Sequence, residues 1–283
     1  MGPPSPDRGE RPWGGDGAFV CCVFPGQVVC GRGPGYIRNT VPRSPTRIPS
    51  HRHYQESAGP RVCPAPYPVD VFDLAPSAPS PGGLAIGFDL DLTLADTRAG
   101  IAAVYAALAA ETGVPIDTGQ VVRRIGPPLE EELAYWFPAR DVPAMAARYR
   151  AIYADIAVPA TVLMPGAAAA LEAVRDRGGR VVVVSGKNQA DTERTVRFLG
   201  LAADAVVGGL FGADKGAVLR EHGAGAYIGD HTGDVDAARA ASAVAVAVAT
   251  GAFDSAALTA YGADVVLPDL LAFPGWLGGF RAG

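Results

Sequence analysis

The chain has 283 residues, of which 49% are hydrophobic and 19% charged, and its 24 basic and 29 acidic side chains give a net charge of −5. This length allows one large domain or two modest ones, with enough apolar material for a core. After residue 81 no run of about 18 apolar residues occurs, which excludes a membrane-spanning helix there, and we expect a cytoplasmic protein.

Residues 1–81 differ in composition from the rest of the chain. They hold 16 of the 25 prolines, all four cysteines, and eight arginines against six acids. Proline and glycine dipeptides interrupt this segment, and no helical or strand periodicity is sustained in it. We therefore predict an irregular, disordered Pro/Gly/Arg-rich leader. An alternative hypothesis is that translation begins near Leu84 and that the preceding residues come from a misplaced start codon.

Three functions are not expected for this leader. Its apolar run, residues 18–30, is too short to cross a membrane and lacks the charged start and cleavage site of a signal peptide. Its acids offset most of the arginine charge, so we expect no nucleic-acid partner. Its cysteines do not have the spacing of zinc ligands; they are Cys21, Cys22, Cys30 and Cys63.

From Leu84 onward, short apolar runs alternate with amphipathic stretches, which is typical of a parallel α/β sheet. We predict a doubly wound fold whose core comprises residues 82–96 and 165–283. The expected strands are Leu84–Phe88, Arg180–Val184, Ala205–Val207, Ala226–Ile228, Ala243–Val248 and Asp264–Leu267. The expected helices are Gly166–Arg177, Gln189–Leu199, Lys215–Glu221, Asp234–Ala241 and Asp254–Ala260.

Residues 97–164 separate the first strand from the second and contain no strand-like run. This segment is predicted to be a small all-helical cap inserted after the first strand. Its expected helices are Arg98–Glu111, Leu129–Trp136 and Pro143–Ile156. Its large aromatic residues are expected to pack inside the helical bundle and not to contact a ligand; they are Tyr105, Trp136, Tyr149 and Tyr153.

Polar residues follow three of the expected strands. Asp89 and Asp91 end the first strand, Ser185 follows the second, and Asp230 and Asp234 follow the fourth. In an open α/β sheet, ligands bind at the carboxyl ends of the strands, where these side chains would gather. Carboxylate oxygens are the ligands of a hard divalent cation, and Mg²⁺ suits a site of a few carboxylates, waters and a substrate phosphate.

Lysine is used sparingly in this chain, which has 22 arginines but only two lysines, Lys187 and Lys215. Solubility is therefore supplied by arginine. Lys215 opens an expected helix and is a suitable point charge for a phosphate and a carboxylate together.

Together these residues resemble the motifs of the haloacid dehalogenase superfamily, and most of all its phosphoglycolate phosphatase-like branch with a helical cap. The run Phe88-Asp89-Leu90-Asp91-Leu92-Thr93-Leu94 resembles the first motif. The second, third and fourth motifs correspond to Val184-Ser185-Gly186-Lys187, to Lys215, and to Gly229-Asp230 with Asp234. The resemblance extends over about 190 residues, from Leu84 to Leu277, with the motifs in the same order.

The resemblance implies a Mg²⁺-dependent phosphatase that hydrolyses a small-molecule phosphomonoester through an aspartyl-phosphate intermediate. Asp89 would attack phosphorus, while Asp91 would protonate the leaving alcohol and then activate water. Mg²⁺ would be held by Asp89, the backbone carbonyl of Asp91, and Asp230, with Asp234 in support. The expected phosphate-binding residues are Thr93, Ser185, Gly186 and Lys215.

Two departures from the family pattern occur. Leu92 stands where the family usually has glycine, and no proline flanks Lys215. The segment Arg123–Glu131 resembles the substrate-facing loop of the cap. Arg123 or Arg124 is a candidate to bind an anionic substrate tail, with an exposed helix-end charge as the alternative reading.

Other functions stay open at this point. A phosphosugar mutase or another phosphotransferase would share the same motifs, because it also forms an aspartyl phosphate. A non-catalytic module that binds a phosphate ligand would predict a damaged motif, and none is evident. A dehalogenase is disfavoured, because Asp91 and the acids around Asp230 are what metal-assisted phosphoryl transfer needs. Phosphoglycolate, a sugar phosphate, a nucleotide and pyrophosphate are all compatible substrates.

Overall fold

The computed structural model describes residues 20–24, 27–31 and 83–281. The chain divides into two units, Met1–Pro68 and Val69–Gly283. In the first unit, β1 (Val20–Phe24) and β2 (Gln27–Gly31) pair as an antiparallel hairpin. The expectation of no strand in the leader was therefore wrong for these residues. Valine-rich runs on both sides of a Pro-Gly dipeptide favour a hairpin over irregular chain.

The remaining predictions for the leader, including disorder and a start near Leu84, lie outside the described residues. Among the described residues, no helix is long and apolar enough to cross a membrane.

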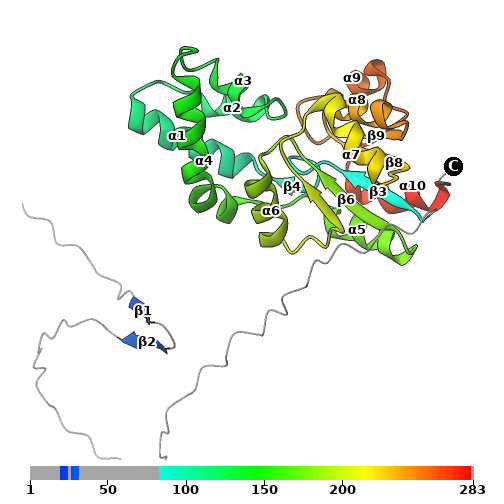
Figure 1. The fold of residues 1–283 in the computed structure, drawn as a ribbon, viewed down its shortest axis with the longest axis horizontal. Coiled ribbons are helices and arrows are strands. Elements are labelled where there is room, and N and C mark those ends of the chain that lie inside the picture. Colours follow the sequence, from blue (N-terminus) through cyan, green and yellow to red (C-terminus); the bar gives the residue numbers. More distant parts are fainter. Residues whose placement is uncertain (1–19, 25–26, 32–82, 282–283) are drawn as a thin grey trace, which may run out of the picture. The chain divides into compact units, whose positions relative to one another are not determined.

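The second unit contains a six-stranded parallel sheet with the order β10-β9-β8-β3-β6-β7 (Figure 1). The prediction of a doubly wound parallel sheet is confirmed. The central strand β3 pairs on one side with β6 and on the other with β8. The strands are β3 (Ala85–Phe88), β6 (Arg180–Val184), β7 (Ala205–Val207), β8 (Ala226–Gly229), β9 (Val244–Val248) and β10 (Val265–Leu267).

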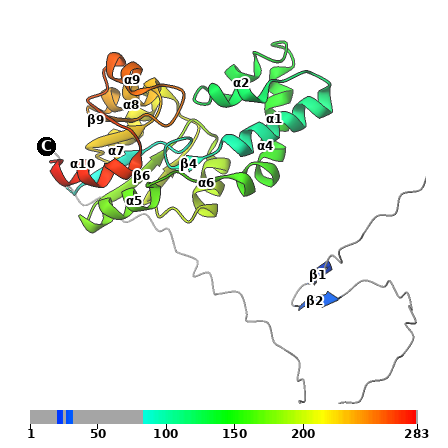
Figure 2. The same ribbon diagram turned by 180° about the vertical axis from the view of Figure 1, so that it is seen from behind.

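Helices cover both faces of this sheet, as the alternation along β6 requires. Val181 and Val183 pack with one hydrophobic cluster, whereas Val182 and Val184 pack with another on the opposite face. The first face is covered by α5 (Ala167–Asp176), α6 (Gln189–Phe198) and α10 (Phe273–Gly279) (Figure 2). The second face is covered by α7 (Lys215–Glu221) and α8 (Thr232–Ala241), and α9 (Ser255–Tyr261) connects β9 to β10.

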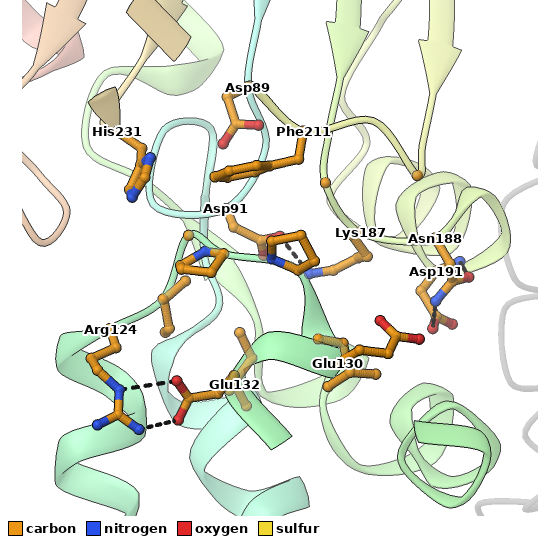
Figure 3. Close-up of a pocket in the computed structure, with 18 of the residues that line it drawn as sticks. Asp89, Asp91, Arg124, Glu130, Glu132, Lys187, Asn188, Asp191, Phe211 and His231 are labelled. Carbon is orange, nitrogen blue, oxygen red and sulfur yellow. Dashed lines mark hydrogen bonds and ion pairs between the residues drawn. The ribbon is translucent and has the colours of Figure 1, made fainter. Parts of the chain in front are cut away.

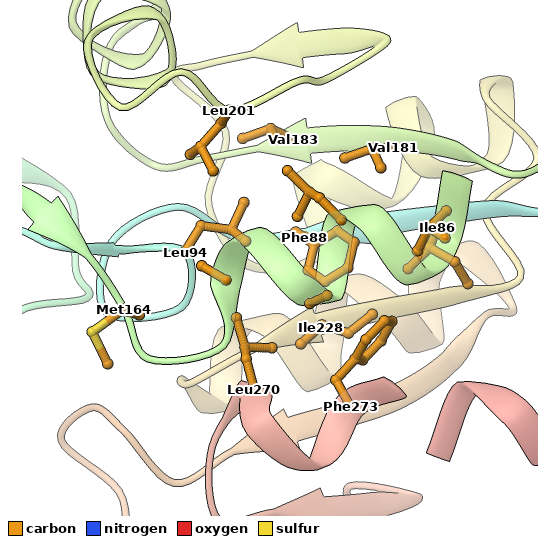
Figure 4. Packing of buried hydrophobic residues seen from close by; sticks show 14 of the residues in the cluster. Ile86, Phe88, Leu94, Met164, Val181, Val183, Leu201, Ile228, Leu270 and Phe273 are labelled. Carbon is orange, nitrogen blue, oxygen red and sulfur yellow. The ribbon is translucent and has the colours of Figure 1, made fainter. Parts of the chain in front are cut away.

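The core on the first face anchors the strand that carries Asp89 (Figure 4). Ile86 and Phe88 of β3 are fully buried there, and the ring of Phe88 lies 5.3 Å from that of Phe273. Burial of each such side chain contributes about 1.5–3 kcal/mol. The carboxyl end of β3 is therefore held in a rigid position.

The segment between β3 and β6 is mainly helical and has a hydrophobic cluster of its own. We refer to α1–α4 as the helical insertion; Figure 1 shows it to one side of the sheet. Its helices are α1 (Arg98–Thr112), α2 (Thr118–Arg123), α3 (Leu129–Leu133) and α4 (Val142–Ile156). Two short antiparallel strands, β4 (Ala95–Asp96) and β5 (Val162–Leu163), lie at its two ends.

Four elements of the second unit were not predicted from the sequence: α2, β4, β5 and α10. α2 has only six residues and is capped by Asp117, whose side chain accepts a hydrogen bond from the backbone N–H of Gln120. β4 and β5 have two residues each, too few to show alternation, so the expectation that residues 97–164 contain no strand was wrong for β5. α10 contains a proline and three glycines, residues that disfavour a helix in most contexts.

A tight loop follows β3 and includes Leu92, the residue that departs from the family pattern. Leu92 has a positive φ of 60°, in the left-handed region that favours glycine. Its side chain is 2% exposed, and its carbonyl accepts a hydrogen bond from the hydroxyl of Thr250. The burial of an apolar side chain offsets the strain of this backbone conformation, which is of the order of 1–3 kcal/mol.

Candidate active site

The carboxyl ends of β3, β6 and β8 meet at the edge of the sheet that faces the helical insertion. A cavity of about 260 Å³ lies there (Figure 3). Its wall combines residues from these strand ends with residues of α1, α3 and α4 and of the loop between α2 and α3. It is small for a ligand pocket and fits a small molecule better than a macromolecular surface.

Asp89 directly follows β3 and is 7% exposed. Its backbone N–H donates to the carbonyl of Ile228 at 2.8 Å, so the ladder between β3 and β8 continues through the residue. Burial raises the pKa of the Asp89 carboxyl to about 7; the charge of Asp234 also raises it, while Lys215 opposes the increase.

Lys215 is buried at the start of α7, and its ammonium group joins three side chains. Its Nζ donates to Oδ1 of Asp89 at 2.8 Å, to Oδ1 of Asp234 at 2.8 Å and to the hydroxyl of Tyr227 at 2.9 Å. Burial alone would lower the pKa of Lys215, but Asp234 and Asp89 outweigh it and hold the pKa well above its ordinary value. Lys215 is therefore a permanent positive charge beside Asp89.

Tyr227 positions this lysine and was not predicted from the sequence. Its hydroxyl accepts from Lys215 and donates to the backbone carbonyl of Val184 at 2.7 Å. Tyr227 lies inside an apolar strand, where an aromatic residue normally signals core packing. No feature of the sequence distinguished its hydroxyl as functional.

Asp230 directly follows β8, and Asp234 lies in the first turn of α8. Asp230 accepts a hydrogen bond from the hydroxyl of Thr93 at 3.0 Å. Asp234 accepts from the backbone N–H of His231 at 3.0 Å, in a capping box that begins α8. Burial and the neighbouring charges of Asp234 and Asp89 raise the pKa of Asp230 well above its ordinary value.

The donor set at this edge fits a hard divalent cation. Carboxylate oxygens of Asp89, Asp230 and Asp234 lie within 4.8 Å of one another, and all three residues are buried. Lys215 compensates one of these three charges, so the ionised cluster keeps an excess of about two negative charges. Oxygen donors with this excess charge match the preference of Mg²⁺.

Asp91, two residues after Asp89, also lines the cavity and contacts the other lysine of the chain, Lys187. Nζ of Lys187 donates to both carboxylate oxygens of Asp91, at 2.5 and 2.7 Å (Figure 3). The same nitrogen lies 4.9 Å from the ring centroid of Tyr153 in α4. Sequence reasoning assigned no role to Lys187; its rarity in an arginine-rich chain was the one available signal.

Ser185 and Gly186 follow β6, but they are placed differently. Ser185 is 1% exposed, and its hydroxyl accepts a hydrogen bond from the backbone N–H of Lys187 at 3.2 Å. Gly186 lines the cavity, whereas Ser185 and Thr93 are buried and do not line it. The phosphate-binding candidates are therefore brought to one region, with Gly186 and Lys215 in direct contact with the cavity.

The two arginine candidates of the helical insertion have different surroundings. Arg124 lines the cavity but donates to both carboxylate oxygens of Glu132, at 3.0 and 2.7 Å. Its guanidinium also lies 3.9 Å from the ring centroid of Tyr135. Arg123 does not line this cavity; it borders a separate hollow beside Leu92.

The aromatic residues of the helical insertion serve packing and also face the cavity. The ring centroids of Tyr105 and Tyr149 are 5.4 Å apart, and those of Tyr149 and Tyr153 are 5.6 Å apart. All three tyrosines are buried in the insertion's own cluster, as predicted, yet they also line the cavity. The expectation that they contact no ligand is therefore not supported by their position.

Comparisons with known proteins agree on one family. The model of the family described as haloacid dehalogenase-like hydrolase matches residues 86–239. A haloacid dehalogenase-like hydrolase, SP0104 from Streptococcus pneumoniae, superposes with a TM-score of 0.62 at 24% identity, covering 69% of this chain and 98% of that one. No curated protein matches.

Two further solved structures have the same fold. A predicted phosphatase from Clostridium acetobutylicum has a TM-score of 0.62 at 20% identity, covering 70% of this chain and 99% of that chain. A predicted phosphoglycolate phosphatase from Haemophilus somnus has a TM-score of 0.60 at 18% identity, with 69% and 98% covered. At these sequence identities, the similarity shows a shared fold and nothing more.

Proposed function

We propose, from the premise that this chain belongs to the haloacid dehalogenase-like hydrolase family, that it is a Mg²⁺-dependent phosphatase of small-molecule phosphomonoesters. The observation that carries the proposal is the buried contact of Asp89 with Lys215, beside the carboxylates of Asp230 and Asp234. A nucleophile, a fixed positive charge and a divalent-cation site are thereby combined at the floor of one cavity.

In the first half of the reaction, an oxygen of Asp89 attacks phosphorus and the bond between phosphorus and the alcohol oxygen breaks. Lys215 donates a hydrogen bond to Oδ1 of Asp89 and is therefore close to the attacked phosphorus. Its positive charge stabilises the negative charge that develops on the phosphoryl oxygens. Gly186, on the cavity wall, leaves room for those oxygens. Mg²⁺, when bound by Asp89 and Asp230, supplies further charge neutralisation for phosphoryl transfer.

Asp91 serves the proton transfers of both halves. In its protonated form Asp91 gives a proton to the departing alcohol oxygen, and the resulting carboxylate then takes a proton from the water that attacks the aspartyl phosphate. That attack breaks the bond between Asp89 and phosphorus and releases inorganic phosphate. Lys187 holds the Asp91 carboxylate at the cavity in the free protein.

The helical insertion is proposed to act as a cap, with residues 97–164 as its extent and residues 82–96 and 165–283 as the catalytic core. Tyrosines of α1 and α4 form the wall opposite Asp89. A wall in that position limits the size of the alcohol part and excludes bulk water during the reaction.

Phosphate release from a panel of small phosphomonoesters, with Mg²⁺ or with EDTA, tests this function. Wild type is expected to release phosphate in the presence of Mg²⁺ but not in the presence of EDTA. The Asp89→Asn variant is expected to lose the activity completely. Asp155→Asn, at an exposed aspartate of α4, is the matched control and is expected to retain it. Phosphorylated protein without release of phosphate would indicate a mutase, and release by Asp89→Asn would contradict the nucleophile.

A further inference from the structure

Each cation in the wall of the cavity already has a carboxylate partner. Arg124 is held by two hydrogen bonds to Glu132, and it is stacked on Tyr135. Glu132 is only 8% exposed, and it also accepts from the indole N–H of Trp136 at 3.0 Å. If the Arg124 guanidinium turned away to a substrate anion, the buried Glu132 carboxylate would keep only the neutral indole N–H of Trp136 and lose its counter-charge, which is costly.

The remaining cations of the wall are paired as well. Arg150 donates to Glu130 at 2.5 Å, and Lys187 donates to both oxygens of Asp91. Lys215 lies on the nucleophile. Within residues 83–281, every lysine and arginine of the cavity wall is therefore charge-paired with a carboxylate.

The charge balance of the wall points the same way. Seven carboxylates and four cations line the cavity. Mg²⁺ and a phosphate dianion cancel each other in charge, so the excess of carboxylates persists in the loaded site. A second negative group on the substrate would be repelled by this excess.

What the wall offers to the alcohol part is aromatic and apolar surface with a few hydroxyls. Tyr105 has a buried hydroxyl with no hydrogen-bond partner among the described residues. Ile101, Val121 and Leu129 add apolar surface beside it. Such a wall suits an uncharged group that presents both C–H and O–H surface.

We infer that the cavity selects phosphate monoesters of uncharged alcohols, of the polyol or sugar type, and discriminates against esters that carry a carboxylate. The inference rests on the proposed phosphatase function and names the substrate class of the same site. It differs from the expectation that Arg123 or Arg124 binds an anionic substrate tail.

The test compares glycerol 3-phosphate with 3-phosphoglycerate, which differ in a CH₂OH group in place of a carboxylate. Wild type with Mg²⁺ is expected to have at least about tenfold higher kcat/KM for glycerol 3-phosphate. Equal or higher kcat/KM for 3-phosphoglycerate would overturn the inference while leaving the phosphatase function intact.

Glu132→Gln provides a gain-of-specificity test. The variant keeps an oxygen for the indole N–H of Trp136 but removes the charge that neutralises Arg124. The ratio of kcat/KM for 3-phosphoglycerate to that for glycerol 3-phosphate is expected to rise about fivefold or more. Glu111→Gln is the matched control, because Glu111 forms the same two-bond pair with Arg148 on the exposed surface; its ratio should stay that of wild type.

Binding separates failure of the inference from failure of the proposed function. Calorimetry with Asp89→Asn and Mg²⁺ is expected to give a Kd for glycerol 3-phosphate at least about tenfold below that for 3-phosphoglycerate. This preference without turnover by wild type would contradict the phosphatase function alone. Tighter binding of 3-phosphoglycerate would overturn the substrate class.

Discussion

At the scale of single residues, each of the two lysines of the chain pairs with a different carboxylate of the site. Lys215 contacts Asp89, and Lys187 contacts Asp91, each at hydrogen-bonding distance. A compact ammonium fits such buried places better than the longer, planar guanidinium of arginine.

Lys187→Met is expected to lower kcat by about 10–100-fold, because the general acid and base would lose the contact that orients it. KM should change by less than about threefold, since Lys187 is occupied by Asp91 in the free protein. Steady-state kinetics with a small phosphomonoester, together with thermal unfolding of the variant, checks this prediction. A rise in KM at unchanged kcat would show that Lys187 binds the substrate phosphate instead.

The sequence predicted that the acidic residues and Lys215 would come together, because each follows a strand end or opens a helix, positions that local patterns reveal. It did not identify Lys187 or Tyr227 as functional. Their roles depend on contacts with Asp91 and Val184, which are distant in the chain. Neither role leaves a periodic signal, since the same residue types occur in ordinary helices and strands.

At the scale of elements, the six parallel strands were predicted within a residue or two of their observed bounds. Parallel strands are buried on both faces and therefore read as continuous apolar runs. The elements that were not predicted are short and depend on their surroundings. β4 and β5, for example, have two residues each and form only because the two ends of the helical insertion meet.

The loop after β9 approaches the site closely at Gly251. A Cβ atom at this position would overlap the Asp230 carboxylate, so Gly251→Ala must displace Asp230. We expect Mg²⁺ affinity to fall by about tenfold or more, as observed for changes in the support of metal ligands. Calorimetric titration with Mg²⁺ measures this. Gly275→Ala is the matched control, since a Cβ there meets no atom within 4 Å, and equal affinities of the two variants would contradict the prediction.

At the scale of the whole molecule, the buried acids connect stability to pH and to metal. In the metal-free folded protein, the pKa of Asp89 is raised from 3.8 to about 7. Between these values, the folded state holds a proton that the unfolded chain has lost. The stability of the metal-free protein therefore falls as pH rises through this window, and the loss is complete above about pH 7.

Bound Mg²⁺ offsets the loss of stability that accompanies deprotonation of Asp89, because its carboxylate ligands are deprotonated in the complex. We expect Mg²⁺ to raise Tm more at about pH 8 than at about pH 5, where the cation competes with a proton. Thermal unfolding with Mg²⁺ or EDTA at both pH values measures the difference. Asp89→Asn should reduce it, and equal Mg²⁺ shifts in wild type at the two pH values would contradict the assignment of Asp89 as a titrating ligand.

The central position of β3 has a consequence for how the chain acquires its structure. β3 pairs only with β6 and β8, whose residues are made roughly 100 and 140 positions later, so the contact order of the sheet is high and its assembly slow. During synthesis, β3, the strand that ends before Asp89, is made before both of the strands with which it pairs. The helical insertion, whose contacts are mostly local, is free to organise in that interval. The wall proposed to select the substrate would therefore form before the strand ends proposed to cleave it.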